Sequence, residues 1–136
     1  MARQARRKSS TGLYHVMMRG ADRRILFADD QDNLGFLLSL KRAKKASGFK
    51  LYAYCLMGNH VHLLLQTGKE PLELVMKRIG TRYAVWYNST YERIGHLFQD
   101  RYRSEAVQDE AYFITVLRYI LNNPVKAGMC DRAMDY

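Results

Sequence analysis

The chain has 136 residues, of which 48% are hydrophobic and 26% are charged, and it carries a formal net charge of +9. This length fits one domain with a single core, and the composition is ordinary for a globular protein. No apolar run reaches the roughly 20 residues of a membrane helix, and the basic N-terminus lacks the apolar stretch of a signal peptide. We therefore expect a cytoplasmic protein without membrane contact.

The excess of positive charge indicates a polyanionic partner. Nucleic acid is favoured, because neutralising phosphates releases condensed counterions. Ten tyrosines, five phenylalanines and one tryptophan are interleaved with the arginines and could stack on bases, although most are expected in the core. The two cysteines, Cys55 and Cys130, form no Cys-x-x-Cys pattern, which excludes a zinc ribbon or finger.

The N-terminal part of the sequence predicts a basic arm followed by a strand. Residues 1–12 are polar and basic, and such an arm can order on a phosphate backbone. Residues 13–136 are expected to form one domain, beginning with a strand over 13–19. His15 shares a face of this strand with Arg19, so it could neighbour other histidines of the sheet. A structural histidine is the commoner alternative.

The next segment predicts a helix and then a strand pair. Asp29 or Asp30 can cap a helix that runs to about residue 47, where Gly48 is a typical terminator. Two short strands follow, joined at Gly58 and Asn59, because both residues tolerate positive φ in a tight turn.

The remaining sequence predicts two more helices with an extended segment between them. Pro71 opens a helix whose apolar residues recur at helical spacing to Trp86. Residues 97–107 are expected to be extended. Asp109 can cap a last helix, which Pro124 is expected to end.

The order of these elements predicts an α+β fold. Strand-helix-strand-strand-helix-strand is the split βαβ arrangement of ferredoxin-like folds, here with one added C-terminal helix. We expect both major helices on one face of an antiparallel sheet, with the other face accessible.

The strand after the turn carries a His-x-His pattern. Side chains alternate along a strand, so His60 and His62 project to one face while Val61, Leu63 and Leu65 project to the other. Two neighbouring imidazoles can share a metal ion. A half-exposed polar strand face is the commoner explanation of such spacing, and a site would need further residues from elsewhere.

Tyr119 and Asn123 can supply those residues. They are four positions apart on the last helix and hence on the same face. A phenol becomes a useful nucleophile beside a cation, and an amide oxygen suits Mg²⁺ or Mn²⁺. The pair alone means little, because Tyr119 could pack against the sheet and Asn123 could cap the helix.

Three ordered motifs, at residues 54–63, 95–102 and 119–128, together resemble those of the single-tyrosine HUH transposases, in particular the REP-associated, IS200-like branch. They contain Asn-His-Val-His, Gly-x-Leu-Phe-Gln-x-Arg-Tyr and Tyr-x-x-x-Asn-Pro-Val-Lys-Ala-Gly. The similarity spans residues 13–136. One departure is Gly58, where relatives commonly have proline.

The resemblance implies a metal-dependent enzyme that cleaves and rejoins single-stranded DNA near hairpins through a 5′-phosphotyrosine. It implies Tyr119 as the nucleophile and His60, His62 and Asn123 as ligands of Mg²⁺ or Mn²⁺. A homodimer is allowed, since dimers occur in the wider family. Candidate backbone contacts are the basic residues Arg19, Lys77, Arg78, Arg82, Arg101 and Arg103.

Two other functions stay open from the sequence. One is an inactive or domesticated hairpin-DNA-binding module of the same fold. The other is an RNA-binding domain with a ferredoxin-like sheet, which the lack of an RNP-type Gly-Phe-Gly-Phe pattern makes the weakest alternative.

Overall fold

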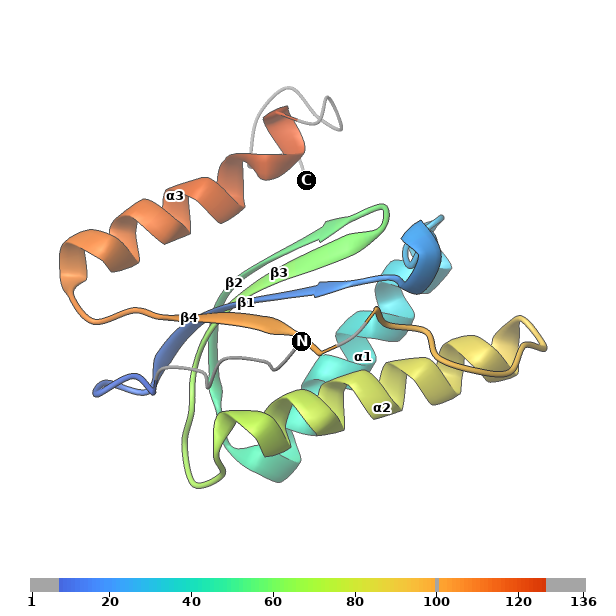
Figure 1. The fold of residues 1–136 in the computed structure, drawn as a ribbon, viewed down its shortest axis with the longest axis horizontal. Coiled ribbons are helices and arrows are strands. Elements are labelled where there is room, and N and C mark those ends of the chain that lie inside the picture. Colours follow the sequence, from blue (N-terminus) through green and yellow to red (C-terminus); the bar gives the residue numbers. More distant parts are fainter. Residues whose placement is uncertain (1–7, 100, 127–136) are drawn as a thin grey trace, which may run out of the picture.

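The computed structural model describes residues 8–99 and 101–126, with side chains up to Asn122. The described chain contains four strands and three long helices, whose arrangement in space is drawn in Figure 1. Their bounds are β1 (Leu13–Arg19), α1 (Asp30–Ser47), β2 (Lys50–Met57), β3 (His60–Gln66), α2 (Leu72–Thr90), β4 (Arg103–Ala106) and α3 (Glu110–Lys126), with a short 3₁₀ helix at Ala21–Arg23. Among the described residues, no helix is long and apolar enough to cross a membrane.

The strands form one antiparallel sheet in the order β2-β3-β1-β4. This order and the βαββαβ succession confirm the predicted ferredoxin-like α+β fold, with α3 added at the end. β3 and β1 are the central strands, so side chains on them have neighbours on both sides. β4 is a short edge strand.

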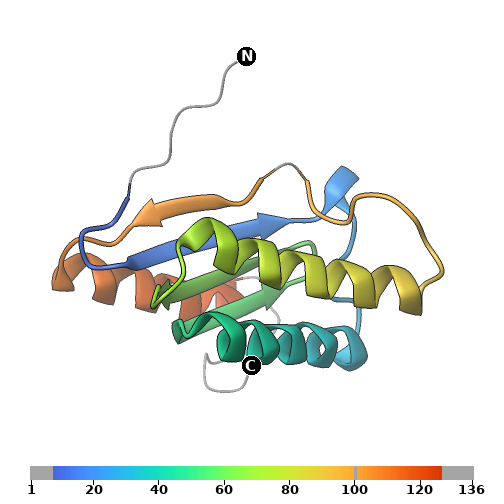
Figure 2. The same cartoon turned by 90° about the horizontal axis from the view of Figure 1, so that it is seen from below.

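Helices α1 and α2 cover one face of the sheet (Figure 2). Val61, Leu63 and Leu65 of β3 point into this layer and are fully buried, as the alternation of the strand predicted. Phe36 of α1 and Tyr83 of α2 meet edge-to-face there, with ring centroids 5.1 Å apart. This layer is the main hydrophobic core.

Helix α3 lies on the opposite face, where it contacts β2 and β3 (Figures 1 and 2). Val116 and Ile120 of α3 pack with Cys55 and Leu64 of the sheet in a second, smaller core. The expectation of an open second face was therefore wrong for this part of the sheet, because the apolar stripe of α3 needs a surface to cover it. We call this side of the sheet the α3 face.

The ends of α1 follow the sequence prediction. Asp29 is the N-cap, and its carboxylate accepts a hydrogen bond from the backbone N–H of Asp32 at 3.0 Å. Gly48 ends the helix with φ of 73°, a left-handed conformation that glycine adopts without strain.

The turn between β2 and β3 is confirmed, but the reason given for it was wrong. Neither Gly58 nor Asn59 has a positive φ. A Cβ atom on Gly58 would lie 3.9 Å from the Ile25 side chain, which is an ordinary contact. A bulkier residue is therefore compatible with this turn.

Two other boundaries differ from expectation. Among the described residues of the predicted extended segment, only 103–106 form a regular strand, while Phe98 makes an isolated bridge to Gly20. Helix α3 continues past Pro124 to Lys126. A proline removes one N–H donor from a helix, and a helix of several turns can lose one hydrogen bond without ending there.

Candidate active site on the α3 face

His60 and His62 lie on the α3 face, as the His-x-His spacing predicted. Their rings meet edge-to-face with centroids 5.1 Å apart. His60 is half-buried, whereas the His62 side chain retains 4% exposure. Their positions beside the turn follow from the β2–β3 hairpin, in which His60 is the first residue of β3.

His15 joins this pair from β1, because β1 and β3 are neighbours in the sheet. Its Nε2 atom lies 3.1 Å from Nδ1 of His62, and the two rings stack with centroids 5.3 Å apart. The sequence had allowed this neighbourhood without selecting it. The register of the sheet, which places Met17 opposite His62, brings the two histidines together diagonally.

The side chain of Asn59 contacts the imidazole of His60. Its Oδ1 atom lies 2.8 Å from Nδ1 of His60. With a carbonyl oxygen as the acceptor, the proton of this hydrogen bond belongs to the imidazole. His60 therefore carries its proton on Nδ1 and has its lone pair on Nε2. Both histidines of the pattern thus have Nδ1 engaged by a neighbour, and Nε2 is the nitrogen left for a ligand.

The electrostatics keep these imidazoles neutral at pH 7. Burial lowers the pKa of His62 to about 4, helped by the nearby His15, His60 and Arg19. Burial and then Arg19 lower the pKa of His60. Burial also lowers the pKa of His15, against the opposing effect of the Glu105 carboxylate. A neutral imidazole can bind a metal without first losing a proton.

Tyr119 lies beside the histidines. Its ring centroid is 5.6 Å from that of His62 and 6.1 Å from that of His15, with edge-on geometry in both contacts. The burial of Val116 and Ile120 fixes the helix, and Tyr119 on the same helix is 45% exposed. The predicted nucleophile is therefore accessible and adjacent to the predicted ligand pair. Asn123 follows one helical turn later, and its side chain lies outside the described ones.

The donors on this face fit a divalent cation. No three His, Cys, Asp or Glu side chains form a metal-binding group in the described part of the chain. His60 and His62 can supply two neutral nitrogens, and oxygen ligands would have to complete the shell. Asn123, one helical turn after Tyr119 on α3, is the expected protein oxygen.

The predicted basic residues divide between two regions. Arg19 is opposite His60 in the sheet and Arg103 is opposite Met17, so both lie on the α3 face beside the histidines. Arg101 lies just before β4. Together with Lys77 of α2, Arg19 and Arg101 line a hollow of about 210 Å³, whose wall includes the rings of Phe98 and Tyr102.

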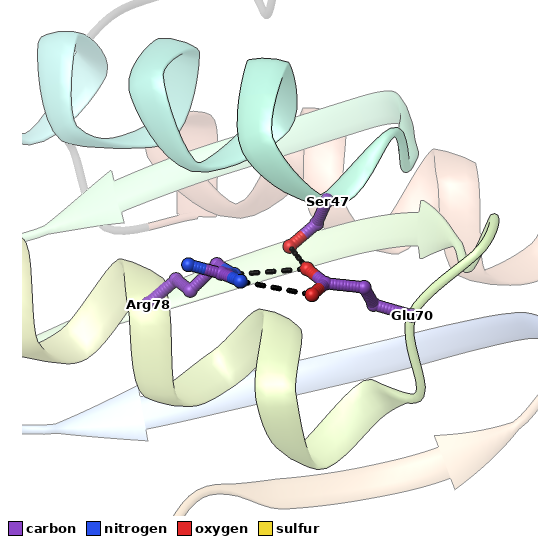
Figure 3. Close-up of polar contacts among 3 residues, drawn as sticks. All are labelled: Ser47, Glu70 and Arg78. Atoms are coloured by element: carbon purple, nitrogen blue, oxygen red, sulfur yellow. Dashed lines mark hydrogen bonds and ion pairs between the residues drawn. The ribbon is translucent and has the colours of Figure 1, made fainter.

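The remaining basic residues lie on α2, which covers the other face of the sheet. Arg78 donates two hydrogen bonds of 2.8 Å to the Glu70 carboxylate, and Ser47 donates another, as Figure 3 shows. The Arg78 guanidinium and the Ser47 hydroxyl lower the pKa of Glu70 to about 2. A phosphate would have to compete with this carboxylate for Arg78. Arg82 is exposed one turn further along.

Comparison with protein families gives a match over residues 8–123 to the family described as "Transposase IS200 like". The chain belongs to the IS200-like transposase family. A REP-associated tyrosine transposase, solved bound to a REP hairpin, superposes on this transposase with a TM-score of 0.83 at 17% identity, over 100% of this chain and 80% of that one. The crystal structure of a candidate transposase from Deinococcus radiodurans gives a TM-score of 0.61 at 22% identity, over 89% of this chain and 97% of that one. Among curated proteins no sequence match is found.

Sequence reasoning did not select two residues that lie next to the histidines of this IS200-like transposase. Asn59 was considered for its backbone, whereas its side chain binds His60. Glu105 was not considered at all, yet it is directly opposite His15 in the β1–β4 register. The position of Asn59 immediately before the His-x-His pattern was a usable signal. Glu105 gave none, because strand register is needed to find it.

Proposed function

We propose that the chain cleaves and rejoins single-stranded DNA beside a hairpin, with Tyr119 as nucleophile and a divalent metal bound by His60, His62 and Asn123. The observation that carries this proposal is the contact between the Tyr119 and His62 rings, with centroids 5.6 Å apart. Membership of a transposase family supports the reaction class.

In the proposed reaction, the phenolic oxygen of Tyr119 attacks the scissile phosphorus and releases its proton to solvent. The bond from phosphorus to the 3′ oxygen breaks, the 3′ oxygen takes up a proton, and a 5′-phosphotyrosine remains. A 3′-hydroxyl then attacks that phosphorus and displaces Tyr119. Each step exchanges one phosphodiester for another, so no external energy source is required. A bound Mg²⁺ or Mn²⁺ would supply Lewis-acid polarisation of the phosphate.

The proposed substrate is DNA with a hairpin next to a single-stranded cleavage site. The similar REP-associated transposase was solved with a REP hairpin, which supports this choice. The net charge of +9 supports a polyanion. Arg19, Arg101 and Arg103 are the stronger candidates for phosphate contacts, because they lie beside the histidines or in the adjacent hollow. Lys77 lines the same hollow from α2, and Arg78 and Arg82 are the other candidates on that helix.

The second candidate, a hairpin-binding module without cleavage, would use the same basic residues. The neutral His60–His62 pair and the adjacent Tyr119 favour the enzyme. The RNA-binding alternative is weakened by α3, which packs over β2 and β3. RNA-binding domains of this fold stack bases on that open sheet face.

The test uses labelled single-stranded oligonucleotides carrying the hairpins that flank this gene, with Mg²⁺ or Mn²⁺ and with EDTA. The wild type should give a metal-dependent covalent protein–DNA band on a denaturing gel, and Tyr119→Phe should not. Tyr54→Phe, at an exposed tyrosine of β2, is the control and should keep the band. A band that survives Tyr119→Phe would move the nucleophile elsewhere. Hairpin binding without a band in any protein would favour the binding module.

A further inference from the structure

His15 has no role in the proposed reaction, yet its Nε2 atom lies 3.1 Å from Nδ1 of His62. We propose that His15 is a positioning residue, an inference that rests on the proposed metal site. It accepts the Nδ1 proton of His62 and thereby keeps the Nε2 lone pair of His62 available to the metal.

One hydrogen bond between two neutral imidazoles carries one proton, so it has two mutually exclusive arrangements. In the first, His62 donates from Nδ1 and has its lone pair on Nε2. In the second, His15 donates from Nε2, and the proton of His62 sits on Nε2, where it would block a metal. The first arrangement is the one that a ligand histidine requires.

The burial of His62 makes this partner necessary. With 4% of the side chain exposed, solvent has little access to Nδ1 of His62. An unpartnered N–H at this depth would lose its hydrogen bond to water without replacement. Stacking of the His15 and His62 rings, with planes 21° apart, also restricts rotation of the His62 ring.

The residues on the β4 side of His15 are compatible with its accepting form. A His15 ring that accepts at Nε2 carries its own proton on Nδ1. Glu105 is directly opposite His15 on the edge strand, and its negative charge acts on that ring. Glu105 itself is held by a hydrogen bond from the Tyr112 hydroxyl.

The neighbouring histidine shows the same arrangement with a different acceptor. Nδ1 of His60 is bound by the Asn59 side-chain oxygen at 2.8 Å. Each histidine of the His-x-His pattern therefore has an acceptor on Nδ1, one from the preceding residue and one from the adjacent strand. Such second-layer acceptors are usual for metal-binding histidines, and losing one typically costs 10- to 100-fold in metal affinity.

The test measures metal binding directly. Co²⁺ is titrated into the DNA-free protein and followed by visible absorption and calorimetry, because imidazole sites bind Co²⁺ more tightly than Mn²⁺. His15→Phe keeps an aromatic ring but removes the acceptor, and His15→Gln offers an amide oxygen near the position of Nε2. We expect roughly 10- to 100-fold weaker Co²⁺ binding in His15→Phe, and near-wild-type binding in His15→Gln.

Two controls separate this inference from the proposed function. His62→Ala should lose the site, and His96→Phe, at the remaining histidine of the chain, should bind Co²⁺ as the wild type does. Unchanged affinity in His15→Phe, with loss in His62→Ala, would overturn the role of His15 alone. Equal weakening in His15→Phe and His15→Gln would also overturn it. A wild type that binds no Co²⁺ would overturn the metal site and this inference together.

A measurement on the unmodified chain does not depend on how the variants fold. Nitrogen NMR of ¹⁵N-histidine-labelled, metal-free protein distinguishes the two tautomers of a neutral imidazole. We expect His62 to be protonated on Nδ1. Protonation of His62 on Nε2 would overturn the proposal.

Discussion

Tyr119 and His62 meet edge-to-face across the α3 face, with ring centroids 5.6 Å apart and planes at 88°. They belong to one chain, and the second hydrophobic core fixes the helix that carries Tyr119 against the strands beside His62. The proposed nucleophile and the proposed metal ligands are thus adjacent without a second subunit.

This arrangement predicts that one chain forms a complete site. When Tyr119→Phe and His62→Ala proteins are mixed, we expect no covalent protein–DNA band, because neither chain can supply its missing group to the other. The measurement is the denaturing-gel assay with each protein alone and with the mixture. A band that appears in the mixture alone would show that the helix acts across a dimer.

The buried histidines predict a stability that depends on pH. The pKa of His62 falls from an ordinary 6.5 in the unfolded chain to about 4 in the fold. Between these values the unfolded chain binds a proton that the native state does not, so stability falls as the pH drops below 6.5. His62 alone should cost about 2 kcal/mol of unfolding free energy by pH 5. His15 and His60 act in the same direction.

Urea unfolding of the metal-free protein at pH 7.5 and pH 5 measures this effect. His62→Phe should reduce the difference between the two conditions, because its contribution no longer titrates. Glu70, whose pKa is lowered to about 2, loses its contribution below pH 4.5 and so does not enter this range. Equal pH dependence in wild type and His62→Phe would contradict the assignment.

Much of the fold could be predicted because local chemistry specifies it. The Asp29 cap and the Gly48 terminator fixed α1, and alternation along β3 separated His60 and His62 from the core side chains. These signals depend on residues close in sequence. The length of the edge strand and the continuation of α3 past Pro124 depend on packing with distant elements, and they were predicted incorrectly.

The candidate site divides in the same way. The alternation of side chains along a strand predicted that His60 and His62 share a face. The contact of His15 with His62 could be found only from the β1–β3 register. The position of Tyr119 beside the histidines required knowing which face α3 covers. Among ten tyrosines, the family resemblance singled out this one, and physical reasoning alone did not.

The division of the basic residues predicts unequal roles in DNA binding. Arg19 and Arg103 lie on the α3 face, whereas Arg78 is bound by Glu70. Arg19→Met and Arg103→Met should each reduce the slope of log affinity against log salt by about 1, as expected for one lost phosphate contact. Arg78→Met should leave that slope nearly unchanged, because the carboxylate already neutralises this charge.

Fluorescence anisotropy with a labelled hairpin oligonucleotide, titrated over a range of salt concentrations in EDTA at pH 8, measures these slopes. EDTA and the alkaline pH keep the comparison free of metal binding and histidine charge. A slope reduced as much by Arg78→Met as by Arg103→Met would show that Arg78 also contacts a phosphate and would contradict the predicted difference.

The second core predicts that anchoring of α3 can be separated from its exposed surface. Ile120 is fully buried under the helix, and its neighbour Leu121 is 45% exposed. Ile120→Ala should lower the unfolding free energy by about 2–5 kcal/mol, since it removes buried methyl groups and leaves a cavity. Leu121→Ala should change it by less than about 0.5 kcal/mol.

The same two variants test whether α3 positions Tyr119. Ile120→Ala should lower the yield of covalent protein–DNA band under conditions where the protein remains folded by circular dichroism, because Tyr119 is adjacent to the lost contact. Leu121→Ala should keep the wild-type yield. An unchanged yield in a folded but destabilised Ile120→Ala protein would mean that contacts other than this core hold the nucleophile beside His62.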